Sequence, residues 1–218
     1  MILVPVKNLA NAKQRLAPVL DQSARTELAQ AMLADVLGVL AAWPNRLEVS
    51  VVTGDPFAIE LASQHRFEVI HDQDEQGETA AVEFAIHACA AQQGVAQTLV
   101  IPGDIPLVQT SELERVLHSA PTEGSVLVPA ADHRGTNAVL QRPVKLFPLR
   151  FGNDSFRPHL AAARAARKPC VVLFLPGIAL DIDTPSDLAE LAALPGETRS
   201  QLLARQWGFA SLPAAANE

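Results

Sequence analysis

Short apolar runs alternate along the chain with longer stretches in which apolar residues recur every three or four positions. The short runs predict buried strands, and the periodic stretches predict helices with one buried face. The expected strands are residues 2–6, 48–53, 67–70, 98–101, 125–129, 137–140 and 171–175. The expected helices are residues 23–43, 78–93, 111–118 and 155–167, one ending near Arg66 and one starting at Pro185. This alternation predicts an α/β fold with a mostly parallel sheet between helices.

The alternation breaks once, where the expected strands 125–129 and 137–140 follow each other without a helix between them. We interpret this pair as an insertion that makes the sheet mixed. The chain shows no internal repeat and no low-complexity linker, so residues 1–212 are expected to form a single domain. Residues 213–218 are expected to be a disordered tail.

The composition argues against a nucleic-acid-binding protein and against a membrane protein. Hydrophobic residues make up 49% of the 218 positions, but aromatic residues only 5%, so the core is expected to be aliphatic. A net charge of −7 argues against a nucleic-acid partner, which would require a basic face. No apolar run approaches the roughly 20 residues of a membrane helix, and no signal peptide is recognisable. We therefore expect a soluble, cytoplasmic protein, with Cys89 and Cys170 as buried thiols.

The charge is unevenly distributed at the start of the chain. Residues 1–20 contain no carboxylate, yet they include Lys7, Lys13 and Arg15. Ligands of open α/β sheets bind beyond the carboxyl ends of strands, which is where this basic loop is expected to lie. It lacks the glycine spacing of known phosphate-binding loops. The segment is either a binding loop for a small polyanion or an ordinary exposed loop.

Three aspartates follow apolar segments. Asp104 comes directly after the strand 98–101, and it is either a turn-forming residue or a metal ligand. Asp181 and Asp183 are two positions apart in an extended segment, so their side chains point to the same face. Such a pair repels unless a cation lies between the carboxylates, and magnesium accepts this kind of oxygen ligand. Thr184 and Pro185 are typical of a helix start.

Two further segments carry small polar groups. Residues 150–160 combine Gly152 with Ser155 at an expected helix start, where the free amides of residues 153–156 would attract an anion. The alternative is an ordinary capped helix. Residues 135–137 place hydrogen-bonding groups between two strands, or form a plain turn. Asp35, among apolar residues of the first helix, is expected to be a structural hydrogen-bond acceptor.

These motifs, in their order along the chain, resemble those of a known family. The chain contains VPVKNLANAKQRL at 4–16, LVIPGDIPLV at 99–108, GTNAVL at 135–140, RFGNDSF at 150–156 and LDIDTPSDL at 180–188. Together they resemble the CofC/FbiD family, the guanylyltransferases of coenzyme F420 biosynthesis, from about residue 2 to residue 190. The resemblance implies a GT-A-like nucleotidyltransferase fold. It also implies that GTP condenses with 3-phosphoglycerate, phosphoenolpyruvate or 2-phospho-L-lactate and releases pyrophosphate.

The resemblance further implies magnesium as cofactor, a possible homodimer and a downstream deazaflavin transferase that receives the product. It implies residue roles at the matching positions. The magnesium ligands would be Asp104, Asp181 and Asp183, and the catalytic residues Lys7, Lys13 and Asp104. The nucleotide-binding residues would be Lys7, Lys13, Gly77, Thr79 and Pro102. The acid-binding residues would be Thr136, Asn137, Gly152 and Ser155.

One motif departs from the family. Relatives often have Gly-Leu-Asn-Ala-Ala where residues 77–81 read Gly-Glu-Thr-Ala-Ala, so Thr79 replaces an amide by a hydroxyl. Two other functions compete with the family assignment. Another nucleotidyltransferase, such as a molybdenum-cofactor guanylyltransferase, would begin with a glycine-rich loop, and residues 4–16 contain no glycine. A non-catalytic nucleotide-binding regulator would not need three aspartates.

The expected chemistry requires no side-chain nucleophile. An ionised phosphate of the acid would attack GTP, so the absence of a histidine or cysteine nucleophile is consistent with the family. Lys7 and Lys13 are expected to be exposed loop residues whose replacement changes stability little.

Overall fold

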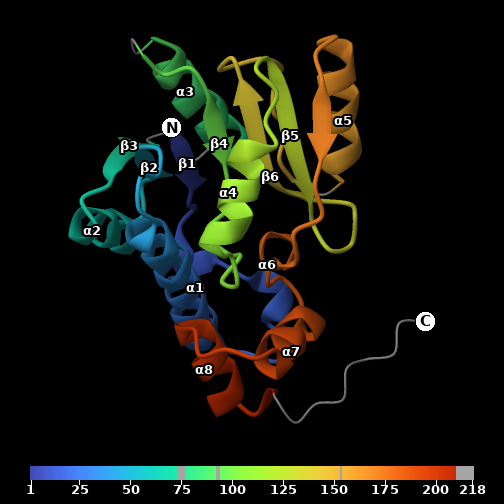
Figure 1. Ribbon diagram of the computed structural model, residues 1–218. Helices are drawn as coiled ribbons and strands as arrows, with labels where there is room; N and C mark the ends of the chain where they lie inside the picture. The colour runs from blue at the N-terminus through green and yellow to red at the C-terminus, as the bar shows by residue number, and fades with distance from the viewer. Residues whose placement is uncertain (73–76, 92–93, 153, 210–218) are drawn as a thin grey trace.

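A computed structural model describes residues 1–72, 77–91, 94–152 and 154–209, and the expected tail at 213–218 lies outside these ranges. The strands form one seven-stranded sheet in the order β3-β2-β1-β4-β6-β5-β7. Figure 1 shows that this sheet is twisted. The strands are β1 Ile2–Pro5, β2 Val49–Thr53, β3 Glu68–His71, β4 Thr98–Val100, β5 Gly124–Pro129, β6 Thr136–Arg142 and β7 Cys170–Val172.

Helices connect most of these strands. They are α1 Gln22–Ala42, α2 Pro56–Gln64, α3 Glu78–Ala91, α4 Thr110–His118, α5 Phe156–Ala165, α6 Pro176–Ala179, α7 Pro185–Ala193 and α8 Arg199–Gln206. Two short 3₁₀ helices, η1 Leu9–Asn11 and η2 Gln14–Leu16, follow β1. All expected strands and helices are present within a few residues of their predicted ends. The elements that the sequence did not predict are η1, η2, α6 and α8.

The strand order creates a switch point at β1. This strand pairs in parallel with β2 on one side and with β4 on the other. The chain therefore builds β2 and β3 outward in one direction before it returns to place β4. β6 runs antiparallel to both β4 and β5, which confirms the expected insertion and the mixed, mostly parallel sheet.

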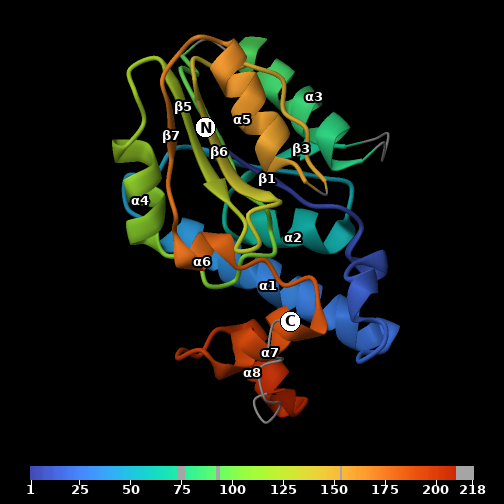
Figure 2. The same cartoon turned by 90° about the vertical axis from the view of Figure 1, so that its right-hand side faces the viewer.

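Helices cover both faces of the sheet because successive strand side chains point to opposite faces. Ile2 and Val4 pack with α1, α2 and α4, whereas Leu3 packs with α3 and α5. Figure 2 shows α3 and α5 on one side of the sheet and α4 on the other. The core is aliphatic, as the composition predicted.

A third, smaller apolar cluster joins η2 and α1 to α7 and α8 at the lower end of the molecule in Figure 1. Asp35 of α1 links to the start of α8, where its carboxylate accepts bonds from Arg199 N at 2.9 Å, Ser200 N at 3.0 Å and Ser200 Oγ at 2.7 Å. This confirms the structural role predicted for Asp35. Cys89 is buried and Cys170 is half-buried, and both are free thiols. None of the described helices has the length and apolar character needed to cross a membrane.

Candidate functional site

Three segments meet at one edge of the sheet. The carboxyl ends of the parallel strands β1 and β4 point to this edge, and the antiparallel β6 begins there. Val100 near the end of β4 pairs with Val139, so the residues after β4 face Thr136 and Asn137 at the start of β6. Gly103 lets the loop after β4 pass close to α1, since a Cβ at this position would lie 3.0 Å from Leu33 Cδ1.

The loop after β1 is held in place by a buried carboxylate. Asp55 caps α2 through Ala58 N at 3.0 Å, and its other oxygen accepts from Leu9 N at 2.9 Å. Further along this loop Lys13 has a φ of 55°, a left-handed conformation that is uncommon for a residue other than glycine. The fixed loop directs the Lys13 side chain back toward the end of β4.

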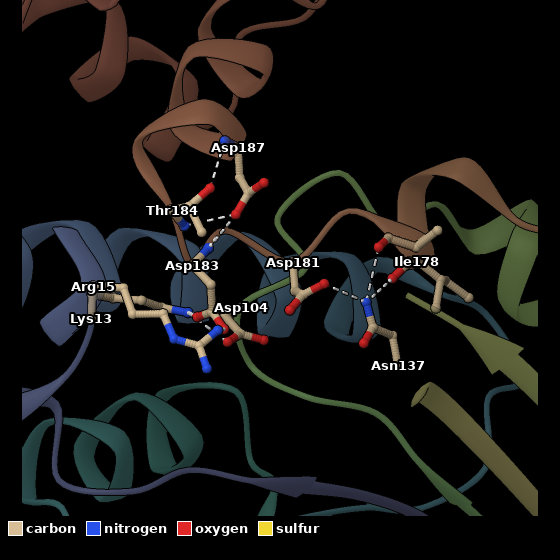
Figure 3. Close-up of polar contacts among 10 residues, drawn as sticks. Lys13, Arg15, Asp104, Asn137, Ile178, Asp181, Asp183, Thr184 and Asp187 are labelled. Atoms are coloured by element: carbon tan, nitrogen blue, oxygen red, sulfur yellow. Dashed lines mark hydrogen bonds and ion pairs between the residues drawn. The ribbon is translucent and has the colours of Figure 1, made fainter. Parts of the chain in front are cut away.

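Lys13 joins two of the predicted metal ligands. Its Nζ lies 2.6 Å from Asp104 Oδ2 and 2.9 Å from Asp183 Oδ1, and its side chain is only 7% exposed (Figure 3). Burial by itself would lower the pKa of Lys13, but the two carboxylates outweigh it and raise the pKa above its usual value. The expectation that Lys13 is an exposed loop residue is therefore wrong, whereas Lys7 is exposed as expected.

Asp181 has a different environment from Asp183. Burial raises the pKa of Asp181 to about 6, and the charges of Asp104 and Asp183 act in the same direction. Burial would also raise the pKa of Asp183, but the nearby Lys13 ammonium holds it below the usual value. Arg15 adds a longer contact to Asp183, with Nη1 at 3.6 Å from Oδ2. Burial and repulsion thus disfavour the charged form of Asp181, whereas Lys13 favours the charged form of Asp183.

The segment that carries Asp181 and Asp183 is fixed at several points. Ile182 is fully buried and its amide donates to Asp104 O at 3.3 Å, so the two aspartates flank a residue that faces the core. A capping box between Thr184 and Asp187 starts α7, which confirms the expected helix start. Asp187 Oδ2 also accepts from Asp183 N at 3.0 Å (Figure 3).

Asn137 supports Asp181 from the β6 side. Its Nδ2 donates to Asp181 Oδ1 at 2.9 Å and to the carbonyl oxygens of Ile178 and Ala179, each at 3.0 Å (Figure 3). An amide nitrogen has two hydrogens, so these acceptors use its full donor capacity. The side chain that was expected to bind the acid thus positions a metal-ligand candidate in the structure.

Two recesses open side by side around these residues. The first, here called the β1 recess, has a volume of about 570 Å³ and lies between the loop after β1 and the loop after β4. The second, the β6 recess, has a volume of about 340 Å³ and lies between the start of β6 and the segment before α5. Pro102, Asp104 and Asp183 line both recesses. The carboxylates therefore form the boundary at which two ligands would meet.

The β6 recess contains the residues expected at the acid site. It is lined by Thr136, Asn137, Gly152 and Ser155, together with Arg15, Arg134 and Asp154. Gly152 has a φ of 121°, a conformation that side chains rarely adopt, although a Cβ there would meet no neighbour within 4 Å. Ser155 is buried, and its side chain makes no capping bond to α5.

One part of the expected anion site is wrong. The amides at the start of α5 were expected to be free for an anion, but Phe156 N donates to Arg134 O at 2.9 Å. Residue 153, which was also expected to contribute, lies outside the described residues. The Phe156 amide is therefore not available to an anion. Other donors at this helix start are the Ser155 hydroxyl and the positively charged Arg134, which pairs with Asp154 at 2.6 Å.

Comparison with known proteins identifies the family to which the chain belongs. The family described as "Guanylyl transferase CofC like" matches residues 1–217. The chain belongs to the CofC-like guanylyltransferase family. This confirms the resemblance seen in the motifs, and it removes the regulator and the molybdenum-cofactor enzyme as competing assignments.

Individual relatives carry several acceptor names. The phosphoenolpyruvate guanylyltransferase of Roseiflexus castenholzii is 37% identical over 205 residues, covering 94% of this chain and 93% of that protein. The 2-phospho-L-lactate guanylyltransferase of Methanothermobacter thermautotrophicus is 31% identical over 212 residues, covering 97% and 92%. The 3-phospho-D-glycerate guanylyltransferase of Colwellia psychrerythraea is 33% identical over 201 residues, covering 92% and 95%.

Solved structures confirm the fold. A protein described as a nucleotide-diphospho-sugar transferase from Desulfovibrio desulfuricans superposes with a TM-score of 0.72 at 22% identity, covering 94% of this chain and 96% of that one. CMP:2-keto-3-deoxy-manno-octonic acid synthetase, solved with CTP, gives a TM-score of 0.57 at 13% identity, covering 94% and 98%. The CofC-like chain thus has the nucleotidyltransferase fold that was expected.

Most of the predicted nucleotide residues lie together. Lys7, Lys13, Gly77 and Pro102 line the β1 recess. Thr79 lies outside that lining, and its Oγ1 accepts from Phe151 N at 3.0 Å and donates to Phe151 O at 3.2 Å. The hydroxyl therefore ties the first turn of α3 to the segment before Gly152. A direct contact between Thr79 and the nucleotide stays a prediction.

Sequence reasoning missed two residues that shape the site. Asp55 was not among the expected site residues. The Asp-Pro pair does indicate a helix cap, but nothing in the pattern indicates the second bond of Asp55, to the loop after β1. His159 was not among the expected site residues either, yet it contacts Thr136 and the segment before Gly152. Its position on the buried side of α5 gave no signal of these partners.

The donor set suits magnesium in its chemistry. Asp104, Asp181 and Asp183 supply only carboxylate oxygens, which magnesium prefers, and two of them border both recesses. Among the described residues, no three carboxylates or other metal-binding groups are arranged closely enough to hold an ion as they stand. The Lys13 ammonium lies between Asp104 and Asp183, so it already neutralises part of the negative charge of the three carboxylates.

Proposed function

We propose that this chain transfers the GMP part of GTP to a small phosphorylated carboxylic acid and releases pyrophosphate. The observation that carries the proposal is the pair of adjoining recesses that share the carboxylates of Asp104 and Asp183. Membership of the CofC-like guanylyltransferase family supports it. The β1 recess, with Lys7 and Lys13, would hold the triphosphate of GTP. The smaller β6 recess would hold the acid.

The reaction needs positioning and charge neutralisation more than proton transfer. An oxygen of the acid's ionised phosphate would attack the α-phosphorus of GTP in line, and the bond to the bridging oxygen of pyrophosphate would break. No general base is required, because the attacking oxygen carries no proton at neutral pH. Lys7 and Lys13 would offset the repulsion between the two anions.

Magnesium is part of the proposal. Asp104, Asp181 and Asp183 would hold it, and the ion would neutralise the charge on the phosphates. The raised pKa of Asp181 supports this assignment, because a buried carboxylate beside two others is stabilised by a cation. Asn137 would keep Asp181 pointed toward the shared boundary.

The acid would be bound mainly by two hydroxyl groups and by the backbone at one glycine. Thr136 and Ser155 are buried hydroxyl residues that line the β6 recess, and Gly152 supplies a backbone conformation suited to close approach. Arg134 and Arg15 add positive charge at the same recess. These groups recognise a phosphate or carboxylate, which 3-phosphoglycerate, phosphoenolpyruvate and 2-phospho-L-lactate all carry.

Pyrophosphate release tests the proposal and identifies the acceptor. GTP and magnesium are incubated with each of the three acids, and ATP replaces GTP as a nucleotide control. We expect rapid release with GTP and one preferred acid, and a loss of about 10²-fold or more in the Asp104→Asn variant. Failure of all three acids with well-folded protein would contradict the proposal.

The product would serve coenzyme F420 biosynthesis and pass to a deazaflavin transferase, as the family implies. A cytoplasmic location belongs to the proposal as well, since both substrates are multiply charged and do not cross a bilayer unaided. A homodimer stays an expectation.

A further inference from the structure

His159 lies behind the β6 recess on α5, and only 1% of its surface is exposed. Each ring nitrogen has a defined partner. Arg150 N lies 2.9 Å from Nε2, and Thr136 Oγ1 lies 3.0 Å from Nδ1. The imidazole therefore connects the backbone before Gly152 to the first residue of β6.

These partners determine where the ring carries its proton. A backbone amide can only donate, so Nε2 must be the unprotonated nitrogen that accepts from Arg150. Burial lowers the pKa of His159 to about 4, which keeps the ring neutral near pH 7. A neutral imidazole has one N–H, and here it must be on Nδ1. His159 thus donates to Thr136, and the Thr136 oxygen is the acceptor.

The direction of this bond leaves the hydroxyl proton of Thr136 available. Thr136 is 6% exposed and lines the β6 recess. Among the described residues, its hydroxyl has no partner other than His159. The neighbouring amide of Asn137 is fully used by protein acceptors. A buried hydroxyl proton without an acceptor is unfavourable, so an acceptor within the recess would satisfy it.

We propose that His159 is a positioning residue that turns the Thr136 hydroxyl into a hydrogen-bond donor for an anionic oxygen of the acid. The inference rests on the proposed function, which places the acid in the β6 recess. His159 itself does not touch the acid. It fixes the direction of one proton, so that the recess presents a donor to the anion before the anion arrives.

A purely structural role for His159 is the competing explanation. Its ring also packs edge-on against Phe151, with centroids 5.2 Å apart, and its loss could simply loosen α5. Such loosening would affect both substrates and would not depend on the Thr136 hydroxyl. A positioning role affects the acid alone and acts through Thr136.

Steady-state kinetics with four variants separates these roles. Thr136→Val should raise the Michaelis constant for the acid by about 10- to 100-fold, the effect of one hydrogen bond to a charged group, while Thr136→Ser stays near wild type. His159→Leu should raise the same constant with little change for GTP. His159→Gln should restore part of the loss, because its amide can both accept from Arg150 and donate to Thr136.

The double variant Thr136→Val/His159→Leu decides whether the two residues act through one another. We expect it to be no worse than Thr136→Val alone. Multiplying effects, or equal losses for GTP and the acid, would overturn the proposal. His118→Leu, at an exposed histidine on α4, is the matched control and should leave both constants unchanged.

Nitrogen NMR on histidine-labelled protein reads the tautomer directly and does not depend on turnover. The His159 signals, identified by their loss in His159→Gln, should show a protonated Nδ1 and a bare Nε2 at pH 7. The opposite tautomer would overturn the proposal even if the kinetics agreed. If no acid supports turnover, the proposed function fails and the proton has no recipient, whereas the NMR result still reports the His159 orientation.

Discussion

At the scale of single residues, the site is a balance of buried charges. Lys13 neutralises Asp104 and Asp183, and Asp181 is left with an amide as its polar partner and a raised pKa. Removing one charge from such a group exposes the others to repulsion and to the cost of burial. Substitutions here should therefore change stability as well as activity.

Lys13→Met tests this coupling, since methionine keeps a long side chain without the charge. We expect the free energy of unfolding to fall by about 1–3 kcal/mol, because two carboxylates lose a charged hydrogen-bond partner. Lys7→Met is the control, and at an exposed position it should cost less than about 0.5 kcal/mol. Urea denaturation measures both. Equal stabilities of the two variants would contradict the central position assigned to Lys13.

Asp181→Asn tests the raised pKa through pH. In the folded chain Asp181 keeps its proton up to about pH 6, whereas the unfolded chain loses it near pH 4. The folded state thus binds more protons in this window, so wild-type stability falls as pH rises through it. Relative to wild type, Asp181→Asn should be equally stable below pH 4 and more stable by about 3 kcal/mol at pH 7 in the absence of magnesium.

Denaturation curves across this pH range, with and without magnesium, give the comparison. Magnesium should reduce or reverse the difference in stability between wild type and variant at pH 7. It would stabilise the ionised carboxylates of the wild type, whereas the variant offers it one ligand fewer. A difference that stays constant from pH 4 to pH 7 would show that the Asp181 carboxyl is not perturbed.

At the scale of elements, the sequence predicted the strands and long helices because their apolar spacing is regular. The missed elements lack that signal. α6 and the two 3₁₀ helices are too short to show a period, and α8 carries few apolar residues. α8 is stabilised by tertiary contacts, chiefly the bonds from Asp35 of α1 and packing against α7.

Asp35→Asn should loosen α8 selectively. An amide keeps one acceptor oxygen where the carboxylate offers two, so at least one of the bonds to Arg199 and Ser200 is lost. We expect a cost of about 1–3 kcal/mol and faster amide hydrogen exchange in α8. Glu27→Gln, at an exposed position of the same helix, is the control. Unchanged exchange in α8 would mean that packing alone holds this helix.

At the scale of the whole molecule, the candidate site forms at one edge of the sheet for two reasons. The order in which strands are added reverses at β1, and β6 runs antiparallel to β4 and so begins where β4 ends. The sequence located the contributing segments, since aspartates after apolar runs mark strand ends. It could not indicate how the side chains pair. Lys13 was expected to be an exposed loop residue, Asn137 was expected to bind the acid, and His159 was given no role. Their partners lie 20 or more residues away in the chain, so no local pattern indicates them.

The central claim is that nucleotide and acid occupy two adjoining recesses that meet at Asp104 and Asp183. A crystal structure with magnesium, a non-hydrolysable GTP analogue and the preferred acid tests it most directly. We expect the triphosphate in the β1 recess beside Lys7 and Lys13, the acid in the β6 recess beside Thr136 and Ser155, and magnesium between them on the aspartates. Both ligands in one recess, or a metal bound away from Asp104 and Asp183, would contradict the account.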